Sequence, residues 1–292
     1  MASIPFDQRD GTIYLDGNMV DWKDAKVHVL THALHYGSCV FEGERAYNGI
    51  IFKSQEHSER LHKSAAIMGM KVPVSSEDLT KLKDQVLKAN NIVDGYVRAF
   101  AWRGSEQMGV SAQQTTTHMA IAAWDWGSYF SAEKRENGIN LCMAQYRRPA
   151  PDMAPTQAKA AGLYMICTIS KHNAEAQGYD DALMLDYRGY VAEATGANIF
   201  LIKNGEIHTP TPDCFLNGIT RQTVIGLAKE MGYDLIERHI KPEELGDFEE
   251  CFLTGSAAEV TAVGSIAEHN YSVGPIVRDL RDAYEKLVRG QS

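Results

Sequence analysis

The chain has 292 residues, of which 44% are hydrophobic and 23% charged, and 29 Lys and Arg against 38 Asp and Glu give a formal net charge of −9. This composition predicts a globular protein of about two domains, and the acidic balance argues against a nucleic-acid partner, because phosphate backbones are bound by clustered basic side chains. No apolar run approaches the roughly 18 residues of a membrane span, and the first ten residues do not resemble a signal peptide, so we expect no membrane association. The five cysteines are an odd number without a C-x-x-C pair, which predicts free thiols in a reducing cytoplasm.

Three turn pairs predict β-hairpins, at Asp16–Gly17, Asn48–Gly49 and Asn204–Gly205. Strands joined by so short a turn must be antiparallel, since a parallel pair needs a long crossover. The paired runs are Thr12–Leu15 with Met19–Trp22, Val40–Tyr47 with Ile50–Phe52, and Asn198–Ile202 with Glu206–His208.

Apolar residues at helical spacing predict helices over 55–68 and 77–89, and strand-like runs at 96–102 and 118–124 complete a first α/β domain of residues 1–126. The polar and charged stretch 127–138 predicts an interdomain linker, followed by a second domain of residues 139–292. Its expected elements are strands at 139–146, 182–185, 190–192, 251–253 and 260–263, and helices at 165–177, 221–231 and 276–288. The expected fold class is therefore α+β in two domains.

His28, His32 and His35 are spaced i, i+4 and i+7, so on one helix they could ligate zinc in a metal-dependent hydrolase. No Asp or Glu stands in register as a fourth ligand or base, and the neighbouring Val29 and Leu30 are typical of a core segment. We prefer histidines that are hydrogen-bonded beside a core, and we expect no metal.

Lys159 lies among small, mostly apolar residues, which favour the neutral amine that a Schiff base requires. Tyr164 could donate a hydrogen bond to a nearby phenolate. Glu193, at the end of a strand-like run, could pair with a protonated ring nitrogen. The plain alternatives are a surface lysine and a carboxylate that faces solvent.

Thr220 suits the N-cap of the helix that follows it, so the backbone N–H groups of Ile219 and Thr220 predict an anion site, suited to a phosphate. The small residues 254–258 form a second turn that could cradle an anion or be only a tight turn. An amine, a phosphate cradle and a carboxylate for a pyridinium nitrogen are together what pyridoxal 5′-phosphate needs.

At these motifs the sequence resembles the fold-type IV pyridoxal-phosphate enzymes, and within them the branched-chain amino acid aminotransferases. The resemblance implies an antiparallel-rich α/β sandwich followed by a β-barrel-like α/β domain. It also implies a homodimer or higher homo-oligomer, with the pocket completed by a loop of a neighbouring subunit. The matching motifs cover nearly the whole chain in the family's order: Ala25–Gly37, Val40–Gly43, Arg45–Tyr47, His57–Leu61, Tyr96–Arg98, Trp124–Gly127, Lys159–Tyr164, Glu193–Phe200, Gly218–Arg221 and Thr254–Thr261.

The resemblance implies a role for each matching cofactor residue. Lys159 would form the Schiff base and move the substrate proton, Glu193 would keep the pyridine nitrogen protonated, and Tyr164 would bond the ring O3′. The remaining cofactor contacts would come from Arg60, Leu216, Ile219, Thr220 and Ser256.

For the substrate, the resemblance implies that the N–H groups of Ser256 and Ala257, with Tyr96, hold the α-carboxylate. Arg98 would let the same pocket accept the distal carboxylate of glutamate. The apolar part of the pocket would be built from Tyr36, Phe41, Val110, Trp126, Tyr129 and Ala258.

The implied reaction is transamination of L-leucine, L-isoleucine or L-valine with 2-oxoglutarate, so the partners are small amino acids and 2-oxo acids. Close alternatives with the same fold are a D-amino acid transaminase, an (R)-selective amine transaminase and an aminodeoxychorismate lyase. Tyr36, Phe41, Tyr96 and Arg98 together favour the branched-chain enzyme. The alternatives outside this fold are the metal-dependent hydrolase and a non-catalytic small-molecule binding protein.

Overall fold

A computed structural model of the protein describes residues 4–127 and 130–291. The described residues form two compact units, the first of which holds the chain up to Gly127 together with Ala158–Gly162, and the second the rest. Both units mix helices with sheets, so the predicted α+β class is confirmed. None of the helices within these described ranges is long and apolar enough to cross a membrane.

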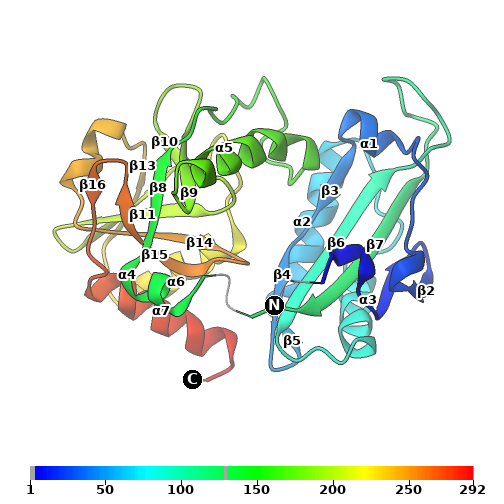
Figure 1. The fold of residues 1–292 in the computed structure, drawn as a ribbon, viewed down its shortest axis with the longest axis horizontal. Helices are drawn as coiled ribbons and strands as arrows, with labels where there is room; N and C mark the ends of the chain where they lie inside the picture. Colours follow the sequence, from blue (N-terminus) through cyan, green and yellow to red (C-terminus); the bar gives the residue numbers. More distant parts are fainter. Residues whose placement is uncertain (1–3, 128–129, 292) are drawn as a thin grey trace. The chain divides into compact units, whose positions relative to one another are not determined.

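Seven strands of the described chain form one antiparallel sheet in the first unit, in the order β2-β1-β7-β6-β4-β5 with β3 paired to β6 (Figure 1). The strands are β1 (Thr12–Leu15), β2 (Asn18–Asp21), β3 (Cys39–Phe41), β4 (Glu44–Tyr47), β5 (Ile50–Ile51), β6 (Gly95–Arg103) and β7 (Thr117–Asp125). The helices are α1 (His32–Tyr36), α2 (Ser54–Ile67) and α3 (Ser76–Ala89), with short 3-10 helices at Phe6–Gln8 and Trp22–Asp24.

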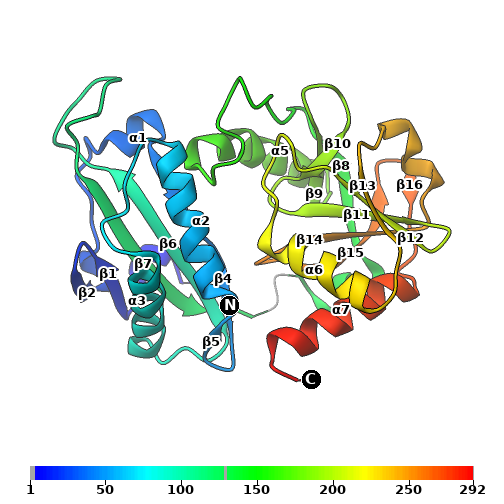
Figure 2. The same ribbon diagram turned by 180° about the vertical axis from the view of Figure 1, so that it is seen from behind.

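Alternation along β6 explains how this sheet presents a site. Val97, Ala99 and Ala101 are buried on one face, whereas Tyr96 and Arg98 point to the opposite face because successive strand residues alternate. Figure 2 shows α2 and α3 lying side by side across the first sheet, and α3 begins where Ser75 accepts a hydrogen bond from the Asp78 N–H.

The strands of the second unit form a sheet that closes on itself. Its order is β10-β9-β8-β15-β14-β11-β12-β13, and a further pairing of β10 with β11 joins six of these strands into a barrel. The strands are β8 (Ile139–Met143), β9 (Asp181–Leu185), β10 (Val191–Ala194), β11 (Asn198–Lys203), β12 (Glu206–Pro210), β13 (Leu235–Arg238), β14 (Glu250–Gly255), β15 (Glu259–Ile266) and β16 (His269–Asn270).

Helices pack against this barrel, and a buried apolar cluster that includes Leu141, Ile199 and Leu253 forms its core. The helices are α4 (Ala132–Asn137), α5 (Tyr164–Ala176), α6 (Ile219–Glu230) and α7 (Pro275–Val288), with 3-10 helices at Ala161–Leu163 and Pro242–Asp247.

The three predicted hairpins and the long helices are confirmed, and the elements that differ have local reasons. The run from Val40 to Tyr47 is two strands rather than one, because the chain leaves the β3 register at Glu42 and Gly43. The stretch expected to be only a linker contains α4, capped by the Ser131 hydroxyl, which accepts from the Lys134 N–H.

Candidate active site

Lys159 lies against the edge strand β3 of the first unit. Its carbonyl accepts a hydrogen bond from the Phe41 N–H at 3.1 Å, and its own N–H donates to the Ser64 hydroxyl of α2 at 3.0 Å. A β-bridge between Val40 and Ala160 continues the attachment. The backbone of Lys159 is therefore held by the sheet and α2, while its Nζ lies 5.0 Å from the centre of the Phe41 ring.

Four of the predicted substrate residues come together on the face of this sheet that carries Tyr96 and Arg98. Phe41 is paired directly with Phe100 of β6, and side chains paired across antiparallel strands share a face. The Arg98 guanidinium lies 4.8 Å from the centre of the Phe41 ring and donates to the Tyr96 hydroxyl at 3.4 Å. The Trp126 ring lies 5.5 Å from that of Tyr96. This wall offers apolar rings and one cation to the same ligand.

The Arg60 guanidinium is held by a buried carboxylate. Its Nε and one terminal nitrogen each donate to Glu42 at 2.7 Å, and His57 Nδ1 contacts the same carboxylate at 2.6 Å. Burial alone would raise the pKa of the Glu42 carboxyl, but Arg60 and His57 hold that pKa far below its usual value. Glu42 is therefore an anion near neutral pH, and its two hydrogen bonds fix the direction of Arg60.

Glu193 of the second unit lies in β10, where its carboxylate is 3.3 Å from Arg148 and accepts from the Asn198 amide at 3.2 Å. Burial would lower the pKa of the Arg148 guanidinium, but Glu193, Cys167 and Tyr164 raise it overall. The Arg148 guanidinium is thus the charged neighbour of the Glu193 carboxylate. Tyr164 is the first residue of α5.

The predicted N-cap of α6 is wrong by two residues. The helix begins at Ile219, with Gly218 as its N-cap, so Thr220 lies inside the first turn and its hydroxyl cannot play the capping role. The reason is that Gly218 N–H donates to Asn198 Oδ1 at 3.1 Å, which fixes the chain before the helix. The N–H groups of Ile219 and Thr220 still belong to the first turn, which lacks helical acceptors. Leu216 precedes this turn, and its carbonyl accepts from the Asn198 amide at 3.0 Å.

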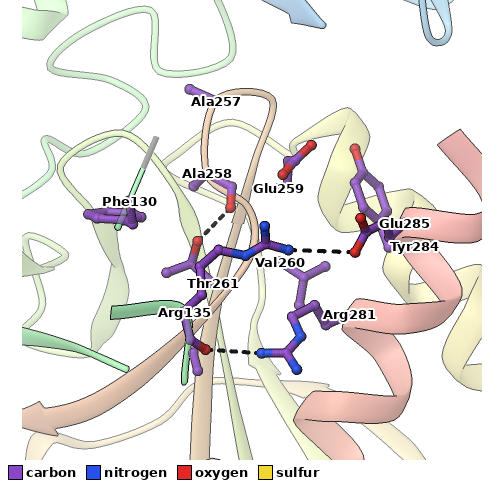
Figure 3. Close-up of a pocket in the computed structure, with 11 residues that line it drawn as sticks. Phe130, Arg135, Ala257, Ala258, Glu259, Val260, Thr261, Arg281, Tyr284 and Glu285 are labelled. Atoms are coloured by element: carbon purple, nitrogen blue, oxygen red, sulfur yellow. Dashed lines mark hydrogen bonds and ion pairs between the residues drawn. The ribbon is translucent and has the colours of Figure 1, made fainter. Parts of the chain in front are cut away.

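The turn between β14 and β15 carries Ser256, Ala257 and Ala258. Its far end is pinned where the Thr261 hydroxyl donates to the Ala258 carbonyl at 2.5 Å (Figure 3). Glu259, directly after the turn, has a φ of 53°, in the left-handed region that a glutamate rarely adopts. The turn is thus a constrained segment rather than a free loop.

A small cavity lies behind this turn, with Arg135 and Arg281 at its base (Figure 3). Its volume of about 20 Å³ has room for about one water molecule, so it is too small for an amino acid. Arg135 lies 3.5 Å from Glu285, and its carbonyl accepts from Arg281 at 3.0 Å. These two contacts join α4 to α7.

Two of the predicted pocket residues lie elsewhere on the first unit. Tyr36 ends α1, is 45% exposed and stacks on His32, while Val110 is 84% exposed. Tyr129 lies outside the described residues, and Ala258 belongs to the turn above.

The histidine segment does not form one helical face. α1 begins only at His32, so His28 precedes it, and the His32 ring nitrogens contact the Ser38 hydroxyl and the Gly109 carbonyl. His35 contacts the Val29 carbonyl at 3.2 Å. The predicted hydrogen bonds are confirmed, but the prediction that the segment belongs to a core is wrong, because Val29 is 71% and Leu30 46% exposed and only His32 of the three histidines is buried.

Sequence reasoning missed three residues that organise the site, namely Glu42, Arg148 and Asn198. The available signals were weak: Glu42 stands in a strand-like run, and Asn198 is a polar residue at the start of a strand, where Asn is depleted. Their roles depend on partners far away in the sequence.

The model of the class IV amino-transferase family matches residues 39–266. This chain belongs to the class IV aminotransferases. The branched-chain-amino-acid aminotransferase of Pseudomonas aeruginosa is 41% identical to it over 291 residues, which cover 97% of this chain and 95% of the relative. The predicted resemblance is therefore confirmed.

Solved structures agree with this assignment. A branched-chain aminotransferase from Thermoproteus uzoniensis, crystallised with norvaline, has a TM-score of 0.93 at 36% identity and covers 97% of this chain and 96% of its own. The branched-chain amino acid aminotransferase of Escherichia coli has a TM-score of 0.94 at 37% identity, with the same coverage. Further branched-chain aminotransferase structures contain pyridoxamine 5′-phosphate, N-(5′-phosphopyridoxyl)-L-glutamate or 4-methylvaleric acid. The predicted fold-type IV architecture of this class IV aminotransferase is confirmed.

Two buried polar atoms fit a bound anionic cofactor and substrate. Arg98 Nε and the Thr254 hydroxyl are two of nine side-chain atoms in the described residues that are buried without a hydrogen-bond partner, and such atoms are costly unless a ligand satisfies them. The Arg98 atom belongs to the wall formed with Phe41 and Tyr96. The Thr254 hydroxyl lies two residues before Ser256 in the sequence. Each atom by itself suits an oxygen of a phosphate or carboxylate group.

Proposed function

We propose that this chain is a pyridoxal-phosphate-dependent branched-chain-amino-acid aminotransferase, which transfers the amino group of L-leucine, L-isoleucine or L-valine to 2-oxoglutarate. The observation that carries the proposal is the position of Arg98 on the wall beside Lys159. The Phe41 ring suits a branched apolar side chain, and the partly unsatisfied Arg98 guanidinium suits the distal carboxylate of glutamate. One pocket can thereby take both substrates of a transamination.

The protein residues have distinct tasks in this reaction. When bound, pyridoxal phosphate supplies an electron sink for the charge left when the substrate Cα loses its proton. Lys159 Nζ would take that proton, because the backbone of Lys159 is anchored on Ser64 and its Nζ lies beside the Phe41 ring. Glu193, paired with Arg148, would hold the proton on the pyridine nitrogen.

The remaining cofactor residues bind and orient. Arg60, directed by Glu42, and the first-turn N–H groups of α6 at Ile219 and Thr220 bind the phosphate. The Ser256 hydroxyl adds to this phosphate site.

Three further contacts complete the proposed site. Tyr164 donates to the ring O3′, and Leu216 packs on the ring. The substrate α-carboxylate is received by the N–H groups of Ser256 and Ala257 and by the Tyr96 hydroxyl, which Arg98 orients.

The exposed apolar side chains around α1 support a homodimer, with a neighbouring subunit's loop completing each pocket. Val29, Leu34, Tyr36, Met108 and Val110 are exposed, and the His32 contact with the Gly109 carbonyl ties α1 to the loop that carries Val110. Replacing Leu34 and Val110 together with Asp should shift the mass measured by light scattering from dimer to monomer. An unchanged dimer would place the interface elsewhere.

We also propose that the enzyme works in the cytoplasm. Its five cysteines are free thiols, as predicted, which suits a reducing compartment. Burial raises the pKa of Cys39 and of Cys167 to about 11, so these thiols stay protonated near neutral pH.

The half-reaction tests this function directly. Purified protein loaded with pyridoxal phosphate is mixed separately with L-leucine, L-glutamate, D-alanine and (R)-1-phenylethylamine, and loss of the visible absorbance is followed. We expect rapid bleaching by L-leucine and L-glutamate, and no stable chromophore in Lys159→Ala. Bleaching chiefly by D-alanine or the amine would assign a sister activity instead, and a wild-type protein that never turns yellow would contradict the proposal.

A further inference from the structure

Asn198 lies where the segments of the proposed cofactor site in the second unit meet. It is the first residue of β11, and its register partners are Glu193 of β10 and Thr254 of β14. Its side chain is nearly buried, with 5% of the residue exposed. An amide buried at this crossing must satisfy its hydrogen bonds within the protein.

The Asn198 amide joins three separate segments. Its nitrogen donates to Glu193 Oε2 at 3.2 Å and to the Leu216 carbonyl at 3.0 Å, and its oxygen accepts from the Gly218 N–H at 3.1 Å. The amide orientation is determined by chemistry, because a carbonyl can only accept and an N–H can only donate. Both amide hydrogens are therefore used, and rotation of the side chain would break three contacts at once.

We propose that Asn198 is a positioning residue that sets the distance between the two ends of the cofactor site. The inference rests on the proposed function, in which Glu193 serves the pyridine nitrogen and the start of α6 serves the phosphate. Since a single side chain binds both the Glu193 carboxylate and the residue that caps α6, movement at one end is transmitted to the other.

Gly218 supports this role independently. Its backbone φ of −59° and ψ of 143° suit any residue, so glycine is not required there by conformation. A Cβ at this position would lie 2.3 Å from Asn198 Oδ1, which is closer than real Cβ contacts. Glycine is thus required at position 218 because the Asn198 side chain comes so close to it. The Gly218→Ala variant would displace the Asn198 amide without removing it.

A variant that changes the charge of residue 198 distinguishes a positioning role from a purely structural one. Asn198→Asp is nearly isosteric, but it loses the two donors and places a second carboxylate beside Glu193. Like charges at such a distance raise the proton affinity of one carboxylate. The pyridine nitrogen would then lose its anionic partner, so the visible spectrum of the bound cofactor should change with pH differently from wild type.

The test uses the cofactor-loaded enzyme and compares wild type with Asn198→Asp, Asn198→Ala and Gly218→Ala. Thr209→Val is the matched control, because it removes another buried hydrogen bond, from the Thr209 hydroxyl to the Ile199 carbonyl, in the same sheet. Three quantities are measured: the dissociation constant for pyridoxal phosphate, the pH titration of the visible absorbance, and the melting temperature without cofactor.

We expect Asn198→Asp and Asn198→Ala to weaken cofactor binding by about 10-fold or more, as expected for loss of hydrogen bonds to a charged group. Asn198→Asp should also shift the pH titration, and Gly218→Ala should weaken binding in the same direction. Thr209→Val should lower only the melting temperature.

The inference is overturned if the Asn198 variants bind the cofactor with wild-type affinity and titration, or if their affinity falls no further than that of Thr209→Val at equal loss of stability. If an Asn198 variant does not fold, Gly218→Ala decides the question with the same readouts. A wild-type protein that forms no chromophore would instead reject the proposed function, so the two failures are distinguishable.

Discussion

Replacing Glu42 with Gln should destabilise the protein measurably, because Glu42 is a fully buried anion paired with the Arg60 guanidinium. Its carboxylate accepts two hydrogen bonds from Arg60 at 2.7 Å and contacts His57 at 2.6 Å. Glutamine keeps one acceptor oxygen but points an NH₂ group at a donor, and it leaves the Arg60 guanidinium without its buried counter-charge. Breaking a buried ion pair on one side costs about 3–5 kcal/mol.

We take about 3 kcal/mol, since the remaining oxygen preserves part of the contact. For a protein of this size that loss lowers the melting temperature by about 6 °C or more. Circular dichroism melts of wild type and Glu42→Gln give the shift. The control is Asp247→Asn, which removes an exposed pair with Lys203 and should change the melting temperature by about 2 °C or less.

The pH dependence checks the cause. The pKa of Glu42 is lowered in the folded protein, so its contribution is complete above the usual glutamate pKa of about 4.3 and is lost as the pH falls towards the folded value. The difference in melting temperature between wild type and Glu42→Gln should therefore be constant from roughly pH 5 to 8. It should become smaller below about pH 4. If Glu42→Gln lowers the melting temperature at neutral pH no more than Asp247→Asn does, the reasoning is refuted.

Three other outcomes follow from the same structure. Arg98→Met should slow the half-reaction with L-glutamate by about 100-fold and change that with L-leucine only several-fold, measured by stopped-flow absorbance, because only glutamate needs the guanidinium. The pKa of His118 is lowered by burial but raised overall by Asp16 and Glu106, so the stability it adds is present below about pH 6.5 and is lost as the pH rises through its folded pKa. His118→Gln should therefore cost about 1 kcal/mol or less at pH 6 and nothing at pH 9 in melting curves, and an equal cost at both pH values would contradict the ion pairs. Leu79→Ala should cost about 2–5 kcal/mol in denaturant unfolding, because Leu79 is fully buried in α3, and a loss under 1 kcal/mol would mean that the core closes around the gap.

The sequence alone determined the elements that depend on near neighbours. The Asp16–Gly17, Asn48–Gly49 and Asn204–Gly205 turns set short antiparallel pairs, and the apolar spacing in α2 and α3 set amphipathic helices. These features depend only on contacts between residues close in the sequence, so local sequence patterns are enough to predict them. The motif around Lys159 likewise indicates the family from the sequence alone.

Only the tertiary structure decided the features that join distant segments. The pairing of β10 with β11 that closes the barrel, the parallel edge strand β13 and the attachment of Ala158–Gly162 to the first unit have no local signal. The start of α6 was misplaced for the same reason, since Asn198, twenty residues earlier in the chain, fixes Gly218 as its cap. Register across strands and burial of polar groups are set by the whole fold, which is why Asn198 and Glu42 became visible as site residues only once their partners were in place.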